Sequence, residues 1–183
     1  AEKMRTALRL LHERHPELKF AISAPREKIR HMIDESLSSF RLKHPDVRLP
    51  ELEISSGDTA RWLQEAGTGL AASGTVTVEC AIAGLPLVVI YKISPLTFFI
   101  AKHIIRIKFF RNFFTMVNII AENEVYQEFL QEFVTPENLL PAVEKILPAG
   151  ERRAVVESEI GRVKKMLAVG TGSKARRASE AVA

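Results

Sequence analysis

The sequence predicts an α/β protein with a doubly wound, mostly parallel β-sheet of the Rossmann-like kind. Short apolar runs alternate with helical segments, and the links between them are short. This alternation is typical of parallel strands whose crossover helices cover both faces of the sheet. Right-handed crossovers then produce two helical layers, and ligands of such folds lie at the carboxyl ends of the strands.

The composition agrees with a globular protein. Of 183 residues, 46% are apolar and 26% are charged, which excludes a disordered chain, a collagen-like repeat and a disulfide-stapled miniprotein. The single cysteine, Cys80, excludes an internal disulfide and a cysteine-rich metal site. A formal net charge of +4 is too small for the whole chain to be a nucleic-acid binder.

The N-terminal third contains two predicted helices and two predicted strands. Apolar residues at helical spacing predict a helix over residues 1–14, which ends before Pro16. The apolar run at 18–23 predicts a buried strand. Pro25 opens a helix over 26–39 with an inner face of Ile29, Met32, Ile33 and Leu37. A proline-containing loop at 44–50 then leads to a strand at 51–55.

The central part carries the strongest strand signal of the chain. A short helix is predicted over 57–66, with Asp58 as its cap and Trp62 on its buried side. Small residues at 68–73 form a strand, and a helix over 74–84 ends at Gly84. The run LPLVVIY at 85–91 is the strongest strand signal.

Helices dominate the rest of the chain. The sequence predicts a helix over 95–107, an aromatic and basic segment up to Phe114, a polar loop and a helical turn near 124–132. Further helices are expected over 136–146 and 150–168, followed by a frayed or disordered end at 173–183.

These elements suggest a domain over 1–148 and a helical basic tail over 149–183. The tail holds eight basic and four acidic residues. The chain opens on a helix, whereas a doubly wound domain normally opens on a strand with its phosphate loop, so we expect a piece of a longer protein that lacks both.

The best candidate site lies where the strand at 68–73 meets the following helix. Exposed amides of Ser73, Gly74 and Thr75 at the helix start could bind phosphate, and Glu79, one turn further, could accept hydrogen bonds from two sugar hydroxyls. The alternative is a capped helix with an exposed glutamate. Lys92, after the strongest strand, could balance a diphosphate or simply lie on the surface.

A polar set follows at Asn118, and the i, i+4, i+7 spacing of Glu124, Glu128 and Gln131 predicts one helix face, which is usually solvated. The five histidines show no metal-ligand spacing, and no metal or other cofactor is expected.

Aromatic and basic side chains are interleaved between residues 98 and 114. This composition describes a segment at a membrane interface or a core helix with snorkelling cations; stacking on nucleic acid is a third alternative that no RNA-binding signature supports. The predicted membrane contacts are Phe98, Phe99, Lys102, Arg106, Lys108, Phe109, Phe110, Arg111, Phe113 and Phe114.

The block ASGTVTVECAIAGLPLVVIYKISPLTFFIAK (72–102) resembles the bacterial lipid-A-disaccharide synthases. The similarity continues through residues 118–121, 128–131 and 135–139. These enzymes are inverting glycosyltransferases of the two-domain GT-B architecture. The resemblance therefore implies that the chain is the C-terminal, donor-binding half of such an enzyme.

The resemblance also implies roles for the matched residues. Ser73, Gly74 and Thr75 would contact the diphosphate of a UDP-sugar, and Glu79 would contact the ribose. The remaining matched positions, expected on the phosphate or facing the cleft, are Lys92, Asn118, Glu128 and Gln131.

The sequence departs from the family pattern at several places. Lys92 replaces an arginine, Val117 a proline, and Gln127 another proline. Glu122-Asn123 replaces a Gly-Arg pair.

The implied reaction is transfer of 2,3-diacylglucosamine from UDP to 2,3-diacylglucosamine 1-phosphate, giving lipid A disaccharide 1-phosphate and UDP. The catalytic acid and base groups would belong to the absent N-terminal domain, so we expect the isolated chain to be inactive. The expected partners are the two lipid substrates, that domain and the inner-membrane surface. We expect a cytoplasmic protein, peripheral on the inner face of the bacterial inner membrane. A homodimer is left open.

Two alternatives remain at this stage. The first is another GT-B UDP-sugar transferase with a soluble acceptor. The second is a nucleotide-binding or membrane-binding domain without catalytic activity.

Overall fold

The computed structural model describes residues 2–72, 74–91 and 113–180. The chain divides into two compact units. The first comprises Ala1–Ala66 with Thr135–Leu140, and the second comprises Gly67–Val134 with Pro141–Ala183. Each unit is described by itself, and helix α7 (Pro136–Glu144) contributes residues to both.

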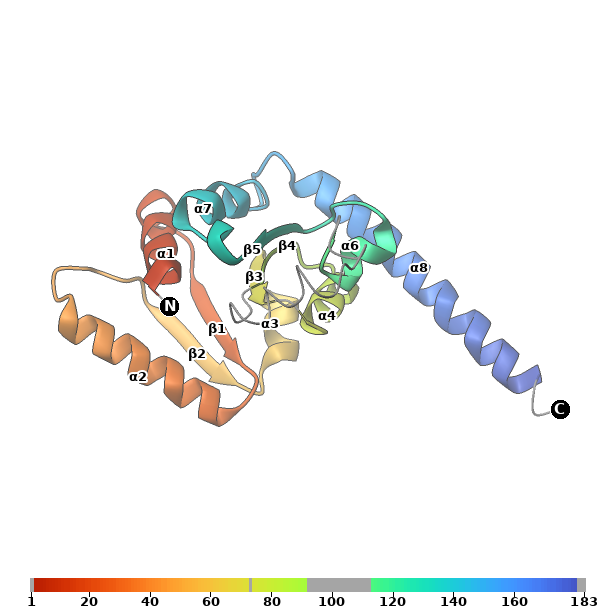
Figure 1. The fold of residues 1–183 in the computed structure, drawn as a ribbon, viewed down its shortest axis with the longest axis horizontal. Coiled ribbons are helices and arrows are strands. Elements are labelled where there is room, and N and C mark those ends of the chain that lie inside the picture. The colour runs from red at the N-terminus through yellow and green to blue at the C-terminus, as the bar shows by residue number, and fades with distance from the viewer. Residues whose placement is uncertain (1, 73, 92–112, 181–183) are drawn as a thin grey trace, which may run out of the picture. The chain divides into compact units, whose positions relative to one another are not determined.

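The first unit is a two-stranded parallel sheet with helices (Figure 1). Strands β1 and β2 pair in register from Phe20 with Leu52 to Ala24 with Ser56. Its elements in chain order are α1 (Glu2–Arg14), β1 (Phe20–Ala24), α2 (Glu27–Lys43), β2 (Leu52–Ser56) and α3 (Thr59–Glu65).

Packing in the first unit follows the sequence pattern only in part. Leu37 of α2 is buried, but Ile29 is 36% exposed and Met32 is 55% exposed, so the predicted inner face of α2 is wrong at those two positions. The indole Nε1 of Trp62 donates to Ser55 Oγ at 2.8 Å, which ties α3 to the end of β2. Asp58 occupies the N-cap position of α3 without a capping side-chain hydrogen bond.

The second unit is a three-stranded parallel sheet with β4 in the centre. β4 pairs with β3 from Gly69 opposite Leu87, and with β5 from Val88 opposite Gln127. The remaining elements of the unit lie around these strands (Figure 1). Its elements are β3 (Gly69–Ala72), α4 (Val76–Ala83), β4 (Leu87–Tyr91), α6 (Met116–Ala121), β5 (Gln127–Leu130), the 3₁₀-helix η2 (Gln131–Phe133) and α8 (Arg153–Glu180).

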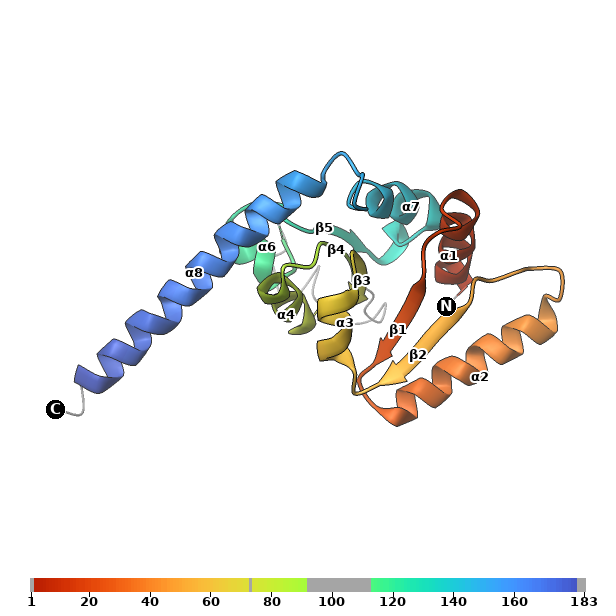
Figure 2. The ribbon, with the colours of Figure 1, turned by 180° about the vertical axis from the view of Figure 1, so that it is seen from behind.

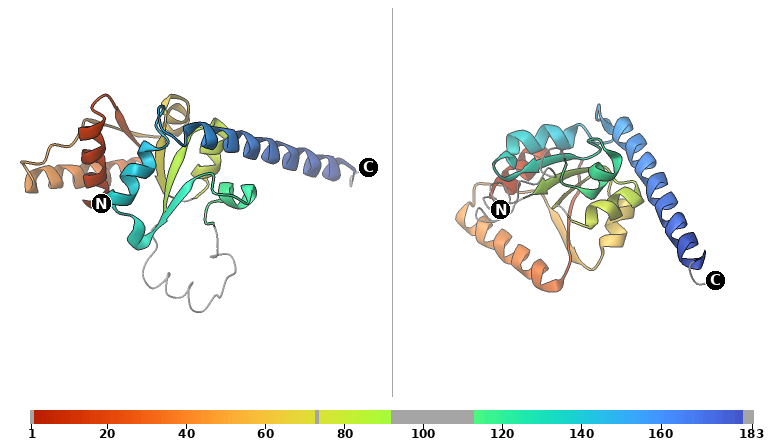
Figure 3. Two further views of the ribbon diagram at one scale, coloured as in Figure 1. Left: turned by 90° about the horizontal axis from the view of Figure 1, so that it is seen from above. Right: turned by 45° about the vertical axis from the view of Figure 1, so that its right-hand side comes forward.

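The core of the second unit lies between the sheet and its helices. Val88 and Val89 of β4 are fully or almost fully buried, as expected for a central strand covered on both faces. Helix α8 packs on α4 and α6, which Figure 2 shows from behind and Figure 3 from two other sides. Tyr126 is completely buried, and its hydroxyl donates to Leu85 O at 3.0 Å. That bond joins the start of β5 to the loop before β4.

The predicted α/β class with parallel strands is confirmed. Two local predictions are wrong. Residues 127–130 form strand β5, followed by a 3₁₀-helix, and not a helical turn, because these residues pair with β4. The predicted polar loop contains helix α6, whose N-cap Thr115 accepts a hydrogen bond from Asn118 N at 3.2 Å.

The last helix is longer than expected, since α8 reaches Glu180 within the segment predicted to fray. The predicted helix over 95–107 lies outside the described residues. The division at residue 148 into a domain and a tail stays a prediction.

Candidate functional site

The first part of the candidate site is the turn between β3 and α4. Gly74 has a φ of 150°, and a Cβ added there would meet no atom within 4 Å. The space at that Cβ position is therefore open among the described residues, and a glycine is the residue that tolerates its backbone. Ser73 lies outside the described residues.

Thr77 holds this turn, and sequence reasoning missed it. Its hydroxyl donates to Gly74 O at 2.8 Å, and its amide donates to the same oxygen at 3.2 Å. Thr77 is completely buried, so it cannot meet a ligand and acts on the backbone of Gly74. The signal that could have found it is a threonine three residues after a glycine at a helix start.

Thr75 and Glu79 are exposed at the start of α4. Thr75 occupies the N-cap position but makes no capping side-chain bond. The helical hydrogen bonds begin with the amides of Thr77, Val78 and Glu79, so the amides before them project toward the open side of the turn. Glu79 lies in the first turn, one turn after Thr75. Within its described residues the turn thus combines amides outside the helical hydrogen bonds with an exposed carboxylate, and their role in ligand binding stays a prediction.

The second part of the candidate site lies at the ends of β4 and β5. The Tyr91 ring at the end of β4 stacks on Phe114, with the ring centroids 6.1 Å apart and an interplanar angle of 20°. Lys92 lies outside the described residues, as do all predicted membrane contacts except Phe113 and Phe114. Both of these are half-buried.

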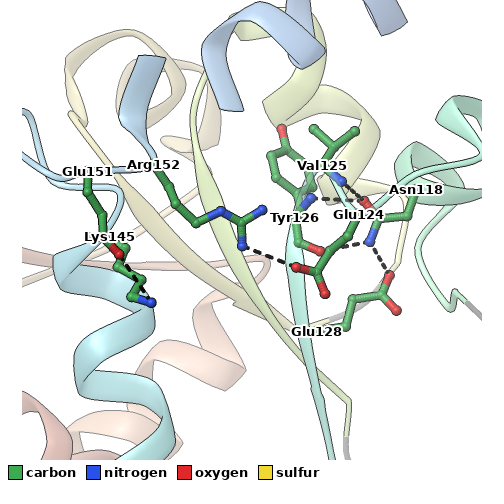
Figure 4. A network of polar contacts seen from close by, with 8 residues as sticks. All are labelled: Asn118, Glu124, Val125, Tyr126, Glu128, Lys145, Glu151 and Arg152. Atoms are coloured by element: carbon green, nitrogen blue, oxygen red, sulfur yellow. Dashed lines mark hydrogen bonds and ion pairs between the residues drawn. The ribbon is translucent and has the colours of Figure 1, made fainter. Parts of the chain in front are cut away.

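Asn118 is buried in a network of hydrogen bonds that joins α6 to β5 (Figure 4). Its Oδ1 accepts from the amides of Val125 at 3.0 Å and Tyr126 at 2.9 Å. Its Nδ2 donates to Tyr126 O at 2.7 Å and to Glu128 Oε1 at 2.9 Å. The side chain therefore uses its full hydrogen-bonding capacity within the protein.

Glu128 binds the backbone at the start of α6. Its Oε2 accepts from Phe114 N at 2.8 Å, and its Oε1 accepts from Thr115 N at 2.7 Å. A carboxylate at a helix N-terminus interacts favourably with the helix dipole and replaces a bound anion. The N-terminus of α6 is thus already occupied, whereas that of α4 is open.

Gln131 lies just beyond β5, in the 3₁₀-helix η2, and adopts a φ of 45°. It is the third member of the predicted polar set. The set was predicted to share a helix face, but Glu128 is in a strand and Gln131 follows that strand. Glu124 precedes β5 and forms an ion pair with Arg152 at 3.1 Å (Figure 4).

Other chemistry in the described residues is limited. Burial, and to a lesser extent the charge of Glu79, raises the pKa of the Cys80 thiol to about 11, so this thiol is protonated at neutral pH. Within 2–72, 74–91 and 113–180, no three His, Cys, Asp or Glu side chains gather as metal ligands would. In those same ranges, no helix has the length and apolarity that a bilayer span requires.

Comparison with known proteins identifies similar sequences. The sequence model of the family described as "Lipid-A-disaccharide synthetase" matches residues 1–182. A lipid-A-disaccharide synthase of Photobacterium profundum is 34% identical over 154 residues, which cover 83% of the chain and 37% of the relative. One of Paramagnetospirillum magneticum is 34% identical over 175 residues, covering 94% and 42% respectively. One of Vibrio parahaemolyticus is 31% identical over 146 residues, covering 79% and 35%. The chain thus spans less than half the length of these relatives.

Proposed function

The chain belongs to the lipid-A-disaccharide synthetase family, and from this premise we propose that it is the UDP-sugar-binding part of a lipid-A-disaccharide synthase. Its donor would be UDP-2,3-diacylglucosamine, and the acceptor of the whole protein would be 2,3-diacylglucosamine 1-phosphate. The products are lipid A disaccharide 1-phosphate and UDP.

The contrast between two helix starts in the second unit is the observation that supports this proposal. The amides at the start of α6 bind the carboxylate of Glu128. The start of α4 has no such partner within the described residues and has open space at Gly74. A diphosphate is attracted by free amides and by the positive end of a helix dipole, so it would bind at α4.

The chemistry follows from this placement. In the reaction the bond between the sugar C1 and the UDP oxygen breaks, and a bond between C1 and the acceptor hydroxyl oxygen forms with inversion. The acceptor hydroxyl loses its proton to a base, and UDP leaves with additional negative charge. Amides at Gly74 and Thr75 would stabilise that charge without a metal. Glu79 would accept hydrogen bonds from the ribose hydroxyls.

The remaining part of the reaction needs more protein than this chain. The matched region is 37% of the Photobacterium profundum relative and 42% of the Paramagnetospirillum magneticum one. We assign the base and most of the acceptor site to the part of the relatives that this chain does not match. The isolated chain would then bind UDP but would not transfer the sugar.

The membrane role is a further element of the proposal and rests on the sequence. The predicted aromatic and basic contacts between residues 98 and 114 would dock on anionic lipid, and the basic tail would add attraction. Such docking would place the protein on the cytoplasmic face of the inner membrane, where the acylated substrates are available.

Nucleotide binding is the first test. Titration of the 183-residue chain with UDP, UMP and uridine, followed by amide NMR, should shift the amide signals of Thr75 and Val76 with UDP and far less with uridine. The matched control is the Glu132→Gln variant, whose substitution lies on an exposed side chain. If UDP leaves these amides unchanged in the unsubstituted chain, the donor-site proposal is wrong.

Substrate class is the second test, carried out on the protein expressed from its complete reading frame. Labelled UDP-2,3-diacylglucosamine should yield a disaccharide with the lipid acceptor, while UDP-N-acetylglucosamine should yield none. Transfer only from the soluble donor would favour the GT-B enzyme with a soluble acceptor. UDP binding without transfer from either donor would favour a non-catalytic binding domain.

A further inference from the structure

We propose that Glu128 is a positioning residue of the donor site and not a ligand of the donor. It would anchor Phe114 and Thr115 to the sheet, so that the chain enters α6 at a defined place beside the ends of β4 and β5. The link to donor binding rests on the proposed function. The contacts that anchor the backbone do not depend on it.

Both oxygens of the half-buried Glu128 carboxylate accept hydrogen bonds from the protein. Oε2 accepts from Phe114 N at 2.8 Å, and Oε1 accepts from Thr115 N at 2.7 Å and from Asn118 Nδ2 at 2.9 Å. Over the described part of the chain, none of the ion pairs includes Glu128. Its charge is therefore balanced by amides and by the dipole of α6.

The strand register explains why Phe114 is held at this place. Glu128 lies opposite Val89, and Leu130 lies opposite Tyr91. Because side chains alternate along each strand and paired residues of parallel strands face the same way, Tyr91 and Glu128 share one face of the sheet. Phe114 meets both, since its ring stacks on Tyr91 and its amide donates to Glu128.

Asn118 adds the connection from α6 to the start of β5. It is completely buried and bonded to Val125, Tyr126 and Glu128. At Glu128 only Oε2 has acceptor capacity beyond its one bond, whereas a donor molecule could reach the polar atoms of Asn118 only if the protein gave up the bonds they already make. Losing them would leave buried groups without partners, which is more costly than any single new contact returns. The two side chains therefore belong to the support of the site.

The contacts of Glu128 affect whether the diphosphate of the donor binds at the start of α4 or at the start of α6. With Glu128 in place, the amides of Phe114 and Thr115 donate to its carboxylate and are not available to donate to a phosphate. Of these two helix starts, the one at α4 then keeps amides that are available to an anion within the described residues. Removing the charge of Glu128 would loosen Phe114 and Thr115. It would also reduce the preference of a diphosphate for the start of α4 over the start of α6.

Amide hydrogen exchange and UDP titration of the 183-residue chain test the proposal, using Glu128→Gln and the control Glu132→Gln. A glutamine has one acceptor oxygen and one donor group, so the amide of Phe114 or of Thr115 must lose its acceptor. That amide should exchange about tenfold faster in the absence of nucleotide. UDP binding should weaken by about two- to thirtyfold, the range for residues that act without touching the ligand. The control should change neither quantity.

Three results would each have a distinct meaning. Weaker UDP binding with unchanged exchange at both amides would make Glu128 a ligand and overturn the proposal. Faster exchange with unchanged UDP affinity would overturn its role in the donor site but leave the proposed function intact. Absence of UDP binding in the unsubstituted chain would refute the proposed function, and the exchange rates alone would then decide whether Glu128 anchors the backbone.

A conservative variant covers the case in which Glu128→Gln does not fold. Glu128→Asp keeps the charge but shortens the side chain by one methylene, so it can reach only part of the backbone it now binds. We expect exchange rates and UDP affinity between those of the unsubstituted chain and of Glu128→Gln. Rates equal to those of the unsubstituted chain at both amides would contradict the anchoring role.

Discussion

Arg162 Nη2 donates to Ala121 O at 2.9 Å, so a guanidinium of α8 binds the C-terminal end of α6. The other end of α6 meets the carboxylate of Glu128. A negative group at the N-terminus and a positive group at the C-terminus both interact favourably with the helix dipole. This short helix, which local sequence does not predict, is therefore held at both ends by side chains distant in the sequence.

Replacing Arg162 should reduce stability. In Arg162→Met the aliphatic volume stays, but the bond to Ala121 O and the ion pair with Glu159 are lost. Because Arg162 is partly exposed, we expect the free energy of unfolding to fall by only about 1 kcal/mol. Urea denaturation measures this, with Lys164→Met on the exposed side of α8 as control. Equal losses in both variants would show that the cap contributes nothing.

Glu122→Gly should stabilise the chain. Glu122 is the C-cap residue of α6 and has a φ of 53°, in the left-handed region that glycine adopts most easily. Relief of this strain should raise the free energy of unfolding by about 0.5–1 kcal/mol. Thermal or urea denaturation measures whether the free energy of unfolding rises or falls. Glu132→Gly, where φ is not positive, should lower stability instead, and a gain there as well would remove the conformational explanation.

Gly74→Ala should weaken UDP binding and destabilise the turn. The φ of 150° at Gly74 is strained for any residue with a Cβ, at a cost of about 1–3 kcal/mol. Calorimetric UDP titration together with urea denaturation measures both effects. The control is Gly161→Ala, because Gly161 lies inside α8 with no atom within 4 Å of an added Cβ. The free energy of unfolding of that variant should rise by about 1 kcal/mol.

Glu79→Ala should weaken UDP binding by about 1–3 kcal/mol, the effect of losing charge-assisted hydrogen bonds to a ligand. Stability should change little, since the side chain is exposed. Isothermal titration with UDP and with a 2′,3′-dideoxy analogue measures the effect. The substitution should weaken the binding of UDP but leave the binding of the analogue unchanged, because the analogue lacks the two ribose hydroxyls. An unchanged UDP affinity would remove Glu79 from the site.

Stability should fall in alkaline solution because of Cys80. The folded state raises the pKa of this thiol from 9.0 to about 11, so it favours the protonated form. The stabilisation is complete below pH 9 and is lost as the pH rises toward 11. Cys80→Ala should lose less stability than the unsubstituted chain over this interval. Urea midpoints measured at pH 8, 9, 10 and 11 test the difference, and parallel curves would contradict it.

The sequence by itself determined the class of the fold, and it marked the helix start that we propose for the diphosphate. Alternating apolar runs and helices require only local periodicity, and from α1 to β4 the structure has them in the predicted order, with β1 parallel to β2 and β3 parallel to β4. The turn at Gly74 is also local, because a small strand, a glycine and a hydroxyl residue are adjacent in the chain. The family model matches the sequence over residues 1–182.

Tertiary structure alone decided what the polar residues near β5 do. The spacing of Glu124, Glu128 and Gln131 fits a helix, but pairing with β4 makes residues 127–130 a strand. Glu128 meets amides that lie 13 and 14 residues earlier, and Asn118 meets a backbone 7 and 8 residues later. The periodicity of a sequence indicates on which face of its own helix or strand a residue lies. It contains no information about which donor from another element will reach that face, and this is why the contacts of Asn118 and Glu128 with the backbone could not be predicted.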